Sequence, residues 1–329
     1  MIASFDLIED HRVELKAHCY RMLGSVFEAE DAVQEALVRA WRFSDRFEGR
    51  TTLRGWLYRI ATNVCLTMLE GRKAKRLTPY LSVPPASDYP QGEPPEGTWL
   101  EPYPQAFLDA IPDSAPAPHA RYEQKEATEL AFVAAIAYLP PRQRAALILH
   151  DVLGWSAHET AKTLASSVAS INSAVQRARE TLRKKLPEGR DALSRQRTSA
   201  KRASLLERYV RAWDAQDLGG LVALLTDDAT FSMPPRPEWY RGRDQILEFL
   251  HWAVRQTGFD RFHAVPTGAN YQPAIVLFGK EPGDVEWRPH AVHVLTPSGE
   301  RIAVIHNFMD PQLPTLFAEP AVLSSSAGA

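Results

Sequence analysis

Cysteine and long apolar runs are scarce in this chain of 329 residues. Its two cysteines, Cys19 and Cys65, each lie in an apolar helical pattern, which favours buried thiols over a disulfide or a metal site. No apolar run approaches the length that spans a membrane, and the first residues lack the pattern of a signal peptide. We therefore expect a cytoplasmic protein with no membrane partner, no metal and no cofactor.

Net charge is also small, at −2, but the charges are segregated along the chain. Acidic residues gather early, at Glu28, Glu30, Asp31 and Glu35, whereas residues 72–76 and 177–185 are basic. Such local patches in a near-neutral protein fit contact with nucleic acid in some places and with protein in others. The length favours two or three domains, and the apolar fraction of 45% is enough for ordinary cores.

The strongest local pattern is that of residues 156–185, which predicts a helix-turn-helix. Ser156 and Glu159 have the spacing of a capping box at the start of a first helix, which ends near Leu164. The short polar segment 165–167 predicts a tight turn. The second helix carries one apolar stripe, made of Ile171, Val175, Ala178 and Leu182.

Amide and guanidinium groups occupy the neighbouring face of this second helix, at Asn172, Gln176, Arg179 and Arg183. These groups reach base edges in a major groove, and arginine also holds phosphates. The segment therefore favours DNA binding, with a solvated helical hairpin as the alternative.

Helical patterns also fill residues 7–76. One apolar face combines Val33, Leu37, Ala40 and Trp41. After a polar break at residues 45–52, a second stripe consists of Leu53, Leu57, Ile60, Ala61, Val64 and Met68.

A proline-rich bridge follows over residues 77–120, where the prolines predict a stiff, extended linker without regular helix or central strand. Its segment 99–104, Trp-Leu-Glu-Pro-Tyr-Pro, is too rich in aromatic residues for a linker that makes no contacts, and we expect it to dock on another part of the molecule.

Residues 201–317 differ in character. An amphipathic helix around Tyr209 and Trp213 opens this part, and a second helix covers residues 218–225. Strand patterns follow at residues 274–278, 291–295 and 302–306, the last two joined by a hairpin over 296–300. Helices followed by antiparallel strands predict an α+β domain.

Four segments carry a family resemblance. Residues 24–41 (GSVFEAEDAVQEALVRAW) and 47–69 (FEGRTTLRGWLYRIATNVCLTML) resemble region 2 of bacterial sigma factors of the extracytoplasmic-function group. Residues 139–186 (LPPRQRAALILHDVLGWSAHETAKTLASSVASINSAVQRARETLRKKL) resemble region 4 of the same group, in the same order and spacing. The last part, with residues 231–246 (FSMPPRPEWYRGRDQI), resembles SnoaL-like domains of the nuclear-transport-factor-2-like cone fold.

The resemblance implies a multi-domain chain with two all-α domains followed by an α+β cone. Its parts are sigma region 2 over residues 7–76, the linker over 77–120, sigma region 4 over 121–187 and a SnoaL-like regulatory domain over 201–317. The implied function is promoter-specific transcription initiation by a non-enzymatic factor whose partners are core RNA polymerase and promoter DNA. It names no anti-sigma factor. The alternative is a DNA-binding module fused to a cyclase-type, isomerase-type or ligand-sensing domain.

The resemblance also assigns roles to residues. The face that would bind the core polymerase comprises Asp31, Ala32, Val33, Gln34 and Glu35. The residues that would read the minus-10 element are Trp56, Tyr58, Arg59 and Asn63, beside a loop at 45–52 that would line a flipped-base pocket. The residues that would read the minus-35 element are Ser170, Asn172, Ser173, Gln176, Arg177 and Arg179.

Two of these assignments keep an alternative. Without the resemblance, the acidic face around Asp31 would be an ordinary solvated helix surface. Trp56 and Tyr58 fit a protein core as well as they fit a base-stacking surface.

The C-terminal part has the material for an apolar pocket, namely Trp213, Trp239, His251, His293 and His306. His293 alternates with Val292 and Val294, so on a strand it faces away from both. Asp214, Asp228, His293 and His306 could act as bases, but no spacing singles one out. A non-catalytic regulatory or packing domain is therefore favoured over an enzyme.

Overall fold

The computed structural model describes residues 5–47, 52–71, 84–90, 99–111, 129–185, 199–234 and 236–317. The basic cluster at 72–76, residues 48–51 of the expected base-pocket loop and residues 188–198 between the last two domains lie outside the described residues. Among the described residues, no helix is long and apolar enough to cross a membrane.

The chain folds into two compact units. The helical unit contains Met1–Arg76 and Phe107–Leu193, and the C-terminal unit contains Leu77–Ala106 and Ser194–Ala329. Most of the linker therefore belongs with the C-terminal domain, although that domain follows the helical unit in sequence.

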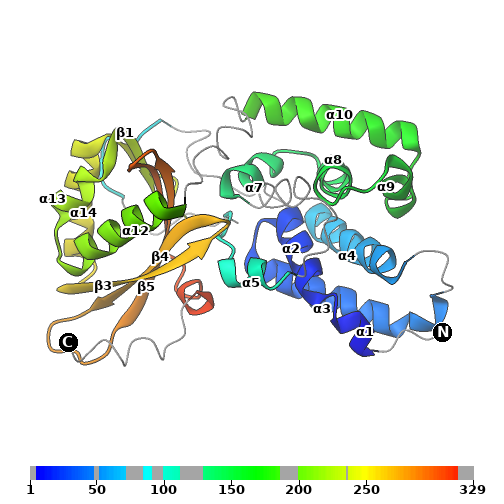
Figure 1. Cartoon of the computed structure of the whole chain (residues 1–329), viewed down its shortest axis with the longest axis horizontal. Helices are drawn as coiled ribbons and strands as arrows, with labels where there is room; N and C mark the ends of the chain where they lie inside the picture. The colour runs from blue at the N-terminus through cyan, green and yellow to red at the C-terminus, as the bar shows by residue number, and fades with distance from the viewer. Residues whose placement is uncertain are drawn as a thin grey trace. The chain divides into compact units, whose positions relative to one another are not determined.

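The first half of the helical unit is a bundle (Figure 1) of α1 (Phe5–Glu9), α2 (Arg12–Leu23), α3 (Val26–Arg42), the short 3₁₀ turn Ser44–Arg46 and α4 (Leu53–Glu70). Two caps fix the helix starts: the side chain of Ser25 accepts from the N–H of Glu28 at 3.1 Å, and that of Thr52 accepts from the N–H of Gly55 at 3.1 Å.

Cys19 and Cys65 are both buried and free, as predicted. A hydrogen bond with Cys65 and burial raise the pKa of the Cys19 thiol. Trp41, which we expected on the apolar face of α3, is instead 61% exposed. The helix turns by about 100° per residue, so Trp41 falls beside Val38 and Gln34 on the outer face, while Val33, Leu37 and Ala40 are buried.

The second half of the helical unit contains α7 (Leu130–Ile136), α8 (Pro141–Leu147) with its π-helical extension Ile148–Val152, α9 (Ala157–Thr163) and α10 (Val168–Lys185). The predicted capping box is confirmed, because Ser156 and Glu159 make both of its bonds. Ala165 has a φ of 47°, which turns the chain sharply between α9 and α10. The predicted stripe of α10 is buried.

The two halves pack together within the unit, α8 against α2 and α4, and α9 against α4. The buried side chain of Arg144 joins them. Its guanidinium donates to the carbonyl oxygens of Met22 in α2 and of Ala137 after α7.

The C-terminal unit is an α+β cone. Its elements are α12 (Ser199–Asp214), α13 (Leu218–Ala223), β1 (Leu225–Ser232), β2 (Trp239–Arg241), α14 (Arg243–Gln256), β3 (Arg261–Ala269), β4 (Gln272–Lys280), β5 (Arg288–Ser298), β6 (Arg301–Phe308) and the 3₁₀ turn Pro314–Leu316. The strand order is β2-β1-β6-β5-β4-β3. Helix α12 packs on β3 and β4, and α14 packs on β1 and β2, so the helices line one face of the curved sheet (Figure 1).

The α+β class is confirmed, but the order of elements is not simply helices and then antiparallel strands. Strands β1 and β2 and helix α14 come before the predicted strands, and β1 pairs with β6 in parallel. The predicted hairpin is tighter than expected: Ser298 pairs with Arg301, so only Gly299 and Glu300 form the turn.

Candidate functional site

The exposed face of α3 carries the predicted polymerase-binding residues. Asp31, Gln34 and Glu35 are exposed, whereas Ala32 and Val33 are buried in the bundle. Glu35 also forms an ion pair with Arg39 at 2.6 Å.

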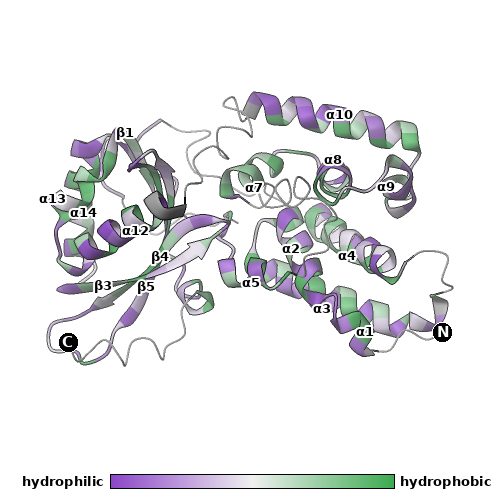
Figure 2. Ribbon diagram, viewed as in Figure 1, coloured by the Kyte–Doolittle hydropathy of each residue, from purple (hydrophilic) through white to green (hydrophobic). Residues whose placement is uncertain are grey.

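Val38 and Trp41 extend the same face by two turns and are 43% and 61% exposed. The mixture of polar and apolar residues along α3 is visible in Figure 2. Sequence reasoning placed Trp41 in the core; the helical repeat counted from Asp31 and Gln34 would have placed it outside.

The four predicted promoter residues of helix α4 differ in their exposure to solvent. Arg59 and Asn63 are exposed, and Trp56 is half-buried with its ring 5.2 Å from that of Phe47. Tyr58, in contrast, is only 1% exposed.

Tyr58 is held in a polar network inside the helical unit. Its hydroxyl donates to Glu14 Oε2 at 3.0 Å, and Arg54 pairs with the same carboxylate at 2.7 Å. Burial raises the pKa of Tyr58. Burial would also raise the pKa of Glu14, but the hydrogen bond and charge of Arg54 lower it overall. The ring of Trp155, from the segment before α9, meets the Tyr58 ring edge-on at 5.4 Å.

Helix α10 presents all of its predicted promoter residues to solvent: Ser170, Asn172, Ser173, Gln176, Arg177 and Arg179. Arg179 has a partner already, since its Nε and Nη2 donate to Asp151 Oδ2 and Oδ1 at 2.9 and 2.7 Å. That bidentate pair raises the pKa of Arg179 and fixes its guanidinium against the π-helical extension of α8, which contains Asp151.

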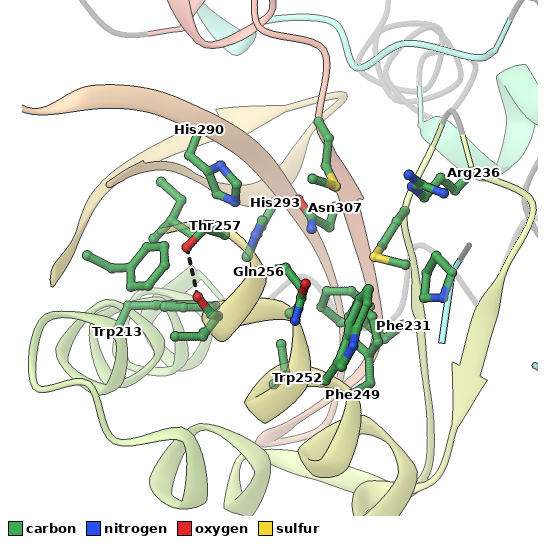
Figure 3. Close-up of a pocket in the computed structure, with 18 residues that line it drawn as sticks. Trp213, Phe231, Arg236, Phe249, Trp252, Gln256, Thr257, His290, His293 and Asn307 are labelled. Atoms are coloured by element: carbon green, nitrogen blue, oxygen red, sulfur yellow. Dashed lines mark hydrogen bonds between the residues drawn. The ribbon is translucent and has the colours of Figure 1, made fainter. Parts of the chain in front are cut away.

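A cavity of about 250 Å³ lies between the sheet and the helices of the C-terminal unit (Figure 3). Of the five predicted pocket residues, Trp213 and His293 line it and Trp239, His251 and His306 do not. His251 is exposed on α14. Trp239 is buried elsewhere. His306 lies on the opposite sheet face, because it neighbours the lining residue Asn307 on β6.

His293 stands at the centre of this cavity beside Asn307 (Figure 3). The two are directly paired across β5 and β6, so their side chains share a face, and the predicted separation of His293 from Val292 and Val294 is confirmed. His293 Nδ1 lies 2.9 Å from the hydroxyl of Tyr209. Burial lowers the pKa of His293 to about 3, so the imidazole is neutral at pH 7.

None of the described residues that line the cavity is a carboxylate. Asp214, one of the possible bases, instead accepts from the N–H of Ala264 at 2.9 Å and pairs with His263 at 3.0 Å. Asp228 is exposed and lies outside the cavity. A histidine whose pKa is lowered to about 3, with no carboxylate in the wall to stabilise its protonated form, makes a poor general base.

The aromatic linker segment docks on the β3–β4 turn, and our expectation that it would dock is thereby confirmed. Trp99 and Tyr103 are buried. The N–H of Tyr103 donates to Asn270 Oδ1 at 2.8 Å, and the N–H of Asn270 donates to the Tyr103 carbonyl at 3.0 Å. Pro104 and Ala269 form an isolated antiparallel β-bridge.

The receiving turn is unusual. Asn270 and Tyr271 have φ of 53° and 59°, a left-handed conformation that tyrosine rarely adopts. The N–H of Tyr271 donates to Gln105 Oε1 at 3.0 Å, so the linker also stabilises this residue. Gly268 permits the approach, because a Cβ there would lie 2.9 Å from Gln105 Cβ.

Gln105 opens the short helix α5 (Gln105–Asp109). We expected no regular helix in the linker, and this prediction was wrong, because no proline interrupts residues 105–111.

A second linker segment, residues 84–90, lies against the same unit. The N–H of Ala86 donates to the Trp239 carbonyl at 2.8 Å, and the Tyr240 hydroxyl donates to the Asp88 carbonyl at 3.1 Å. Tyr89 stacks on Trp252, with ring centres 4.9 Å apart and planes 3° from parallel.

Comparison with known proteins supports the same three parts. Residues 7–75 match Sigma-70 region 2, residues 129–182 match Sigma-70, region 4, and residues 206–310 match the SnoaL-like domain.

Among relatives, the chain is 40% identical over 315 residues to the ECF RNA polymerase sigma factor SigG of Mycobacterium tuberculosis, covering 95% of this chain and 82% of SigG. It is 28% identical over 269 residues to SigJ of the same organism, covering 80% of this chain and 76% of SigJ. The crystal structure of Mycobacterium tuberculosis SigJ has the same fold, with a TM-score of 0.57 at 21% identity over 96% of this chain and 99% of that one. The chain therefore belongs to the ECF RNA polymerase sigma factors, which are non-catalytic initiation factors, and it carries a C-terminal SnoaL-like domain.

Proposed function

We propose that this sigma factor binds core RNA polymerase through α3, reads promoter DNA through α4 and α10, and is modulated by its SnoaL-like domain through the linker. The observation that carries the last step is the reciprocal pair of hydrogen bonds between Tyr103 and Asn270.

The polymerase-binding surface is the outer face of α3. Asp31, Gln34 and Glu35 supply acceptor groups that suit an arginine-rich partner. Val38 and Trp41 continue that face as exposed apolar residues, and a tryptophan of this kind is typical of the energetic centre of a protein interface. We therefore extend the surface to include both.

Promoter reading divides between two helices. The exposed face of α10 suits major-groove contacts. On α4, Trp56, Arg59 and Asn63 are accessible to an unpaired strand, whereas Tyr58 is covered by Trp155. Stacking of a base on Tyr58 requires α4 to separate from the segment before α9, so we infer that the compact helical unit is a resting arrangement that opens on the promoter.

The linker is the route by which the tail would act. The linker joins the minus-10 reader α4 to the minus-35 reader α10. Its conformational flexibility therefore sets the range of distances that these two helices can adopt. Docking of residues 84–90 and 99–105 on the C-terminal domain removes much of that freedom. The tail is covalently attached, so its effective concentration at the linker is high.

Co-purification and run-off transcription with core polymerase test the proposal together. The full chain is expected to bind core and to start transcripts at discrete sites. Failure to bind core would overturn the first part. Binding to core with transcription that is unchanged by removal of the tail would overturn the last.

A further inference from the structure

The first half of helix α10 carries no charged side chain. Residues 168–176 read Val-Ala-Ser-Ile-Asn-Ser-Ala-Val-Gln, and the cations of the helix begin at Arg177. In a helix-turn-helix, the N-terminal residues of the second helix are the ones that contact base edges. Base readout by this end of α10 must therefore use neutral groups, namely amides, hydroxyls and apolar side chains.

Packing within the helical unit decides which of these groups face solvent. Ile171 and Val175 are buried and hold one side of the helix against the unit. The side chain of Ser167 accepts from the N–H of Ser170 at 3.1 Å, which fixes the start of the helix. The first two turns of α10 are therefore held in place before DNA arrives.

A row of three exposed residues runs along the outside of these turns. Val168, Asn172 and Gln176 follow one another at four-residue spacing, and we call them the neutral row. Among the described residues of α7 to α10, Val168 is the one large apolar side chain that is exposed. Neither amide is hydrogen-bonded to another described residue, whereas Arg179 is held by Asp151. Both amides are thus available to a partner outside the chain.

An amide side chain distinguishes adenine from guanine in the major groove. Its carbonyl oxygen accepts from the N6 amino group of adenine while its N–H donates to N7. At guanine the amide oxygen would meet O6, which is also an acceptor, so the bidentate pair is lost. Arginine donates from both arms of its fork and prefers guanine for the same reason. Two amides without a neighbouring cation therefore favour A·T pairs over G·C pairs.

The spacing of the neutral row sets the length of DNA that it can read. Residues four apart are separated by about 6 Å along a helix axis, and successive base pairs by about 3.4 Å. Asn172 and Gln176 can thus reach adenines that are adjacent or separated by one base pair. Val168 lies the same distance before Asn172, where its methyl groups would pack on the 5-methyl group of a thymine.

We propose that the neutral row determines the specificity of this sigma factor for the upstream promoter element. Asn172 and Gln176 each read an adenine, and Val168 reads a thymine methyl group. The inference rests on the proposed role of α10 as the minus-35 reader, and it goes beyond that role by naming the bases.

Selection from random DNA tests the proposal. Holoenzyme assembled from core RNA polymerase and the full chain binds a pool of random duplex DNA, and the bound molecules are sequenced. We expect an upstream element with adenine at two positions that are adjacent or one base pair apart. An upstream element without such adenines would overturn the proposal but leave α10 as a reader. The absence of any upstream element would overturn both the proposal and the role of α10.

Exchange of each amide for arginine gives a gain-of-function test. Asn172→Arg should change one of the two preferred adenines to guanine, and Gln176→Arg the other, with a preference of about tenfold. Both side chains are exposed, so both proteins should fold. Gln245→Arg, at an exposed position of α14, adds the same charge outside the helix-turn-helix and should select the parent's element. Unchanged base preference in both α10 variants would contradict the assignment of the amides.

Removal of a methyl group from the DNA tests Val168. Fragments of the selected element in which each thymine in turn is replaced by deoxyuridine keep every base pair and lose one methyl group. The parent holoenzyme should bind one of these fragments about fourfold more weakly, whereas Val168→Ala should bind it as well as the thymine fragment. Val285→Ala, at an exposed valine of the C-terminal unit, is the matched control and should behave as the parent does. Equal binding of all these fragments by the parent would contradict the part assigned to Val168.

Discussion

Tyr103 and Asn270 exchange hydrogen bonds in both directions: the Tyr103 N–H donates to Asn270 Oδ1, and the Asn270 N–H donates to the Tyr103 carbonyl. They are separated by 167 positions in sequence. Through this pair, a segment that connects two sigma regions is part of the fold of a domain that follows both of them. Release of this segment from the C-terminal domain would therefore also increase the conformational freedom of the linker between the two sigma regions.

Substitution of Asn270 should loosen the linker. Asn270→Gly keeps the left-handed turn and removes only the acceptor, at a cost of about 1 kcal/mol. Asn270→Ala loses the acceptor and also strains the turn, for a total of about 2–3 kcal/mol. Hydrogen exchange of residues 99–105 should become faster in the order parent, Gly, Ala. Equal protection in all three proteins would show that this pair does not hold the linker.

Charge reversal on α3 should abolish polymerase binding. Asp31→Lys with Glu35→Lys replaces acceptors by cations on an exposed face, and Trp41→Ala removes the exposed ring at its end. Each protein should fold, because none of these side chains is buried. Glu286→Lys, on an exposed loop of the C-terminal unit, is the control. Retention of core polymerase by the folded α3 variants in a pull-down would exclude this face.

The two arginines of α10 should contribute unequally to promoter binding. Arg177 is exposed, whereas the guanidinium of Arg179 is bonded to Asp151. Arg177→Ala should cost about 1–3 kcal/mol if it contacts a base, with relaxed specificity at one position, or weaken all sequences alike if it contacts a phosphate. Arg179→Ala should weaken binding less. A binding assay on promoter variants measures both, and no loss from either would show that α10 is not the reader.

Acid should destabilise the C-terminal unit through His293. Its pKa is about 3 in the folded protein and near 6.5 in an unfolded chain. Between these values the unfolded chain takes up a proton that the folded one does not, so stability falls as pH falls from about 6.5 toward 3, by up to about 1.4 kcal/mol per pH unit. Urea denaturation should show a smaller acid loss for His293→Gln than for the parent. His251→Gln, on an exposed helix face, should follow the parent, and identical pH slopes for parent and His293→Gln would refute this account.

Most patterns with a short range in sequence were read correctly, the exceptions being the exposed Trp41 and the linker helix α5. The capping box at Ser156 and the buried stripe of α10 depend on spacings of three and four residues, which can be counted directly in the sequence. The alternation that turns His293 away from Val292 is equally local.

Relations of long range could not be read in this way. The pairing of His293 with Asn307, the parallel contact of β1 with β6 and the burial of Tyr58 under Trp155 are set by tertiary packing. The aromatic composition of residues 99–104 indicated docking but not where, because the receiving turn at Asn270 is identified only by its backbone conformation.

The central claim is that the SnoaL-like domain, through the linker it holds, changes how this sigma factor uses promoters. The most direct test compares run-off transcription by the full chain and by a chain that ends before Ser199, on the same set of promoter fragments with saturating core polymerase. We predict equal binding to core and a change in transcript yield or in the choice of promoter when the tail is removed. Identical yield and identical promoter choice would contradict the claim.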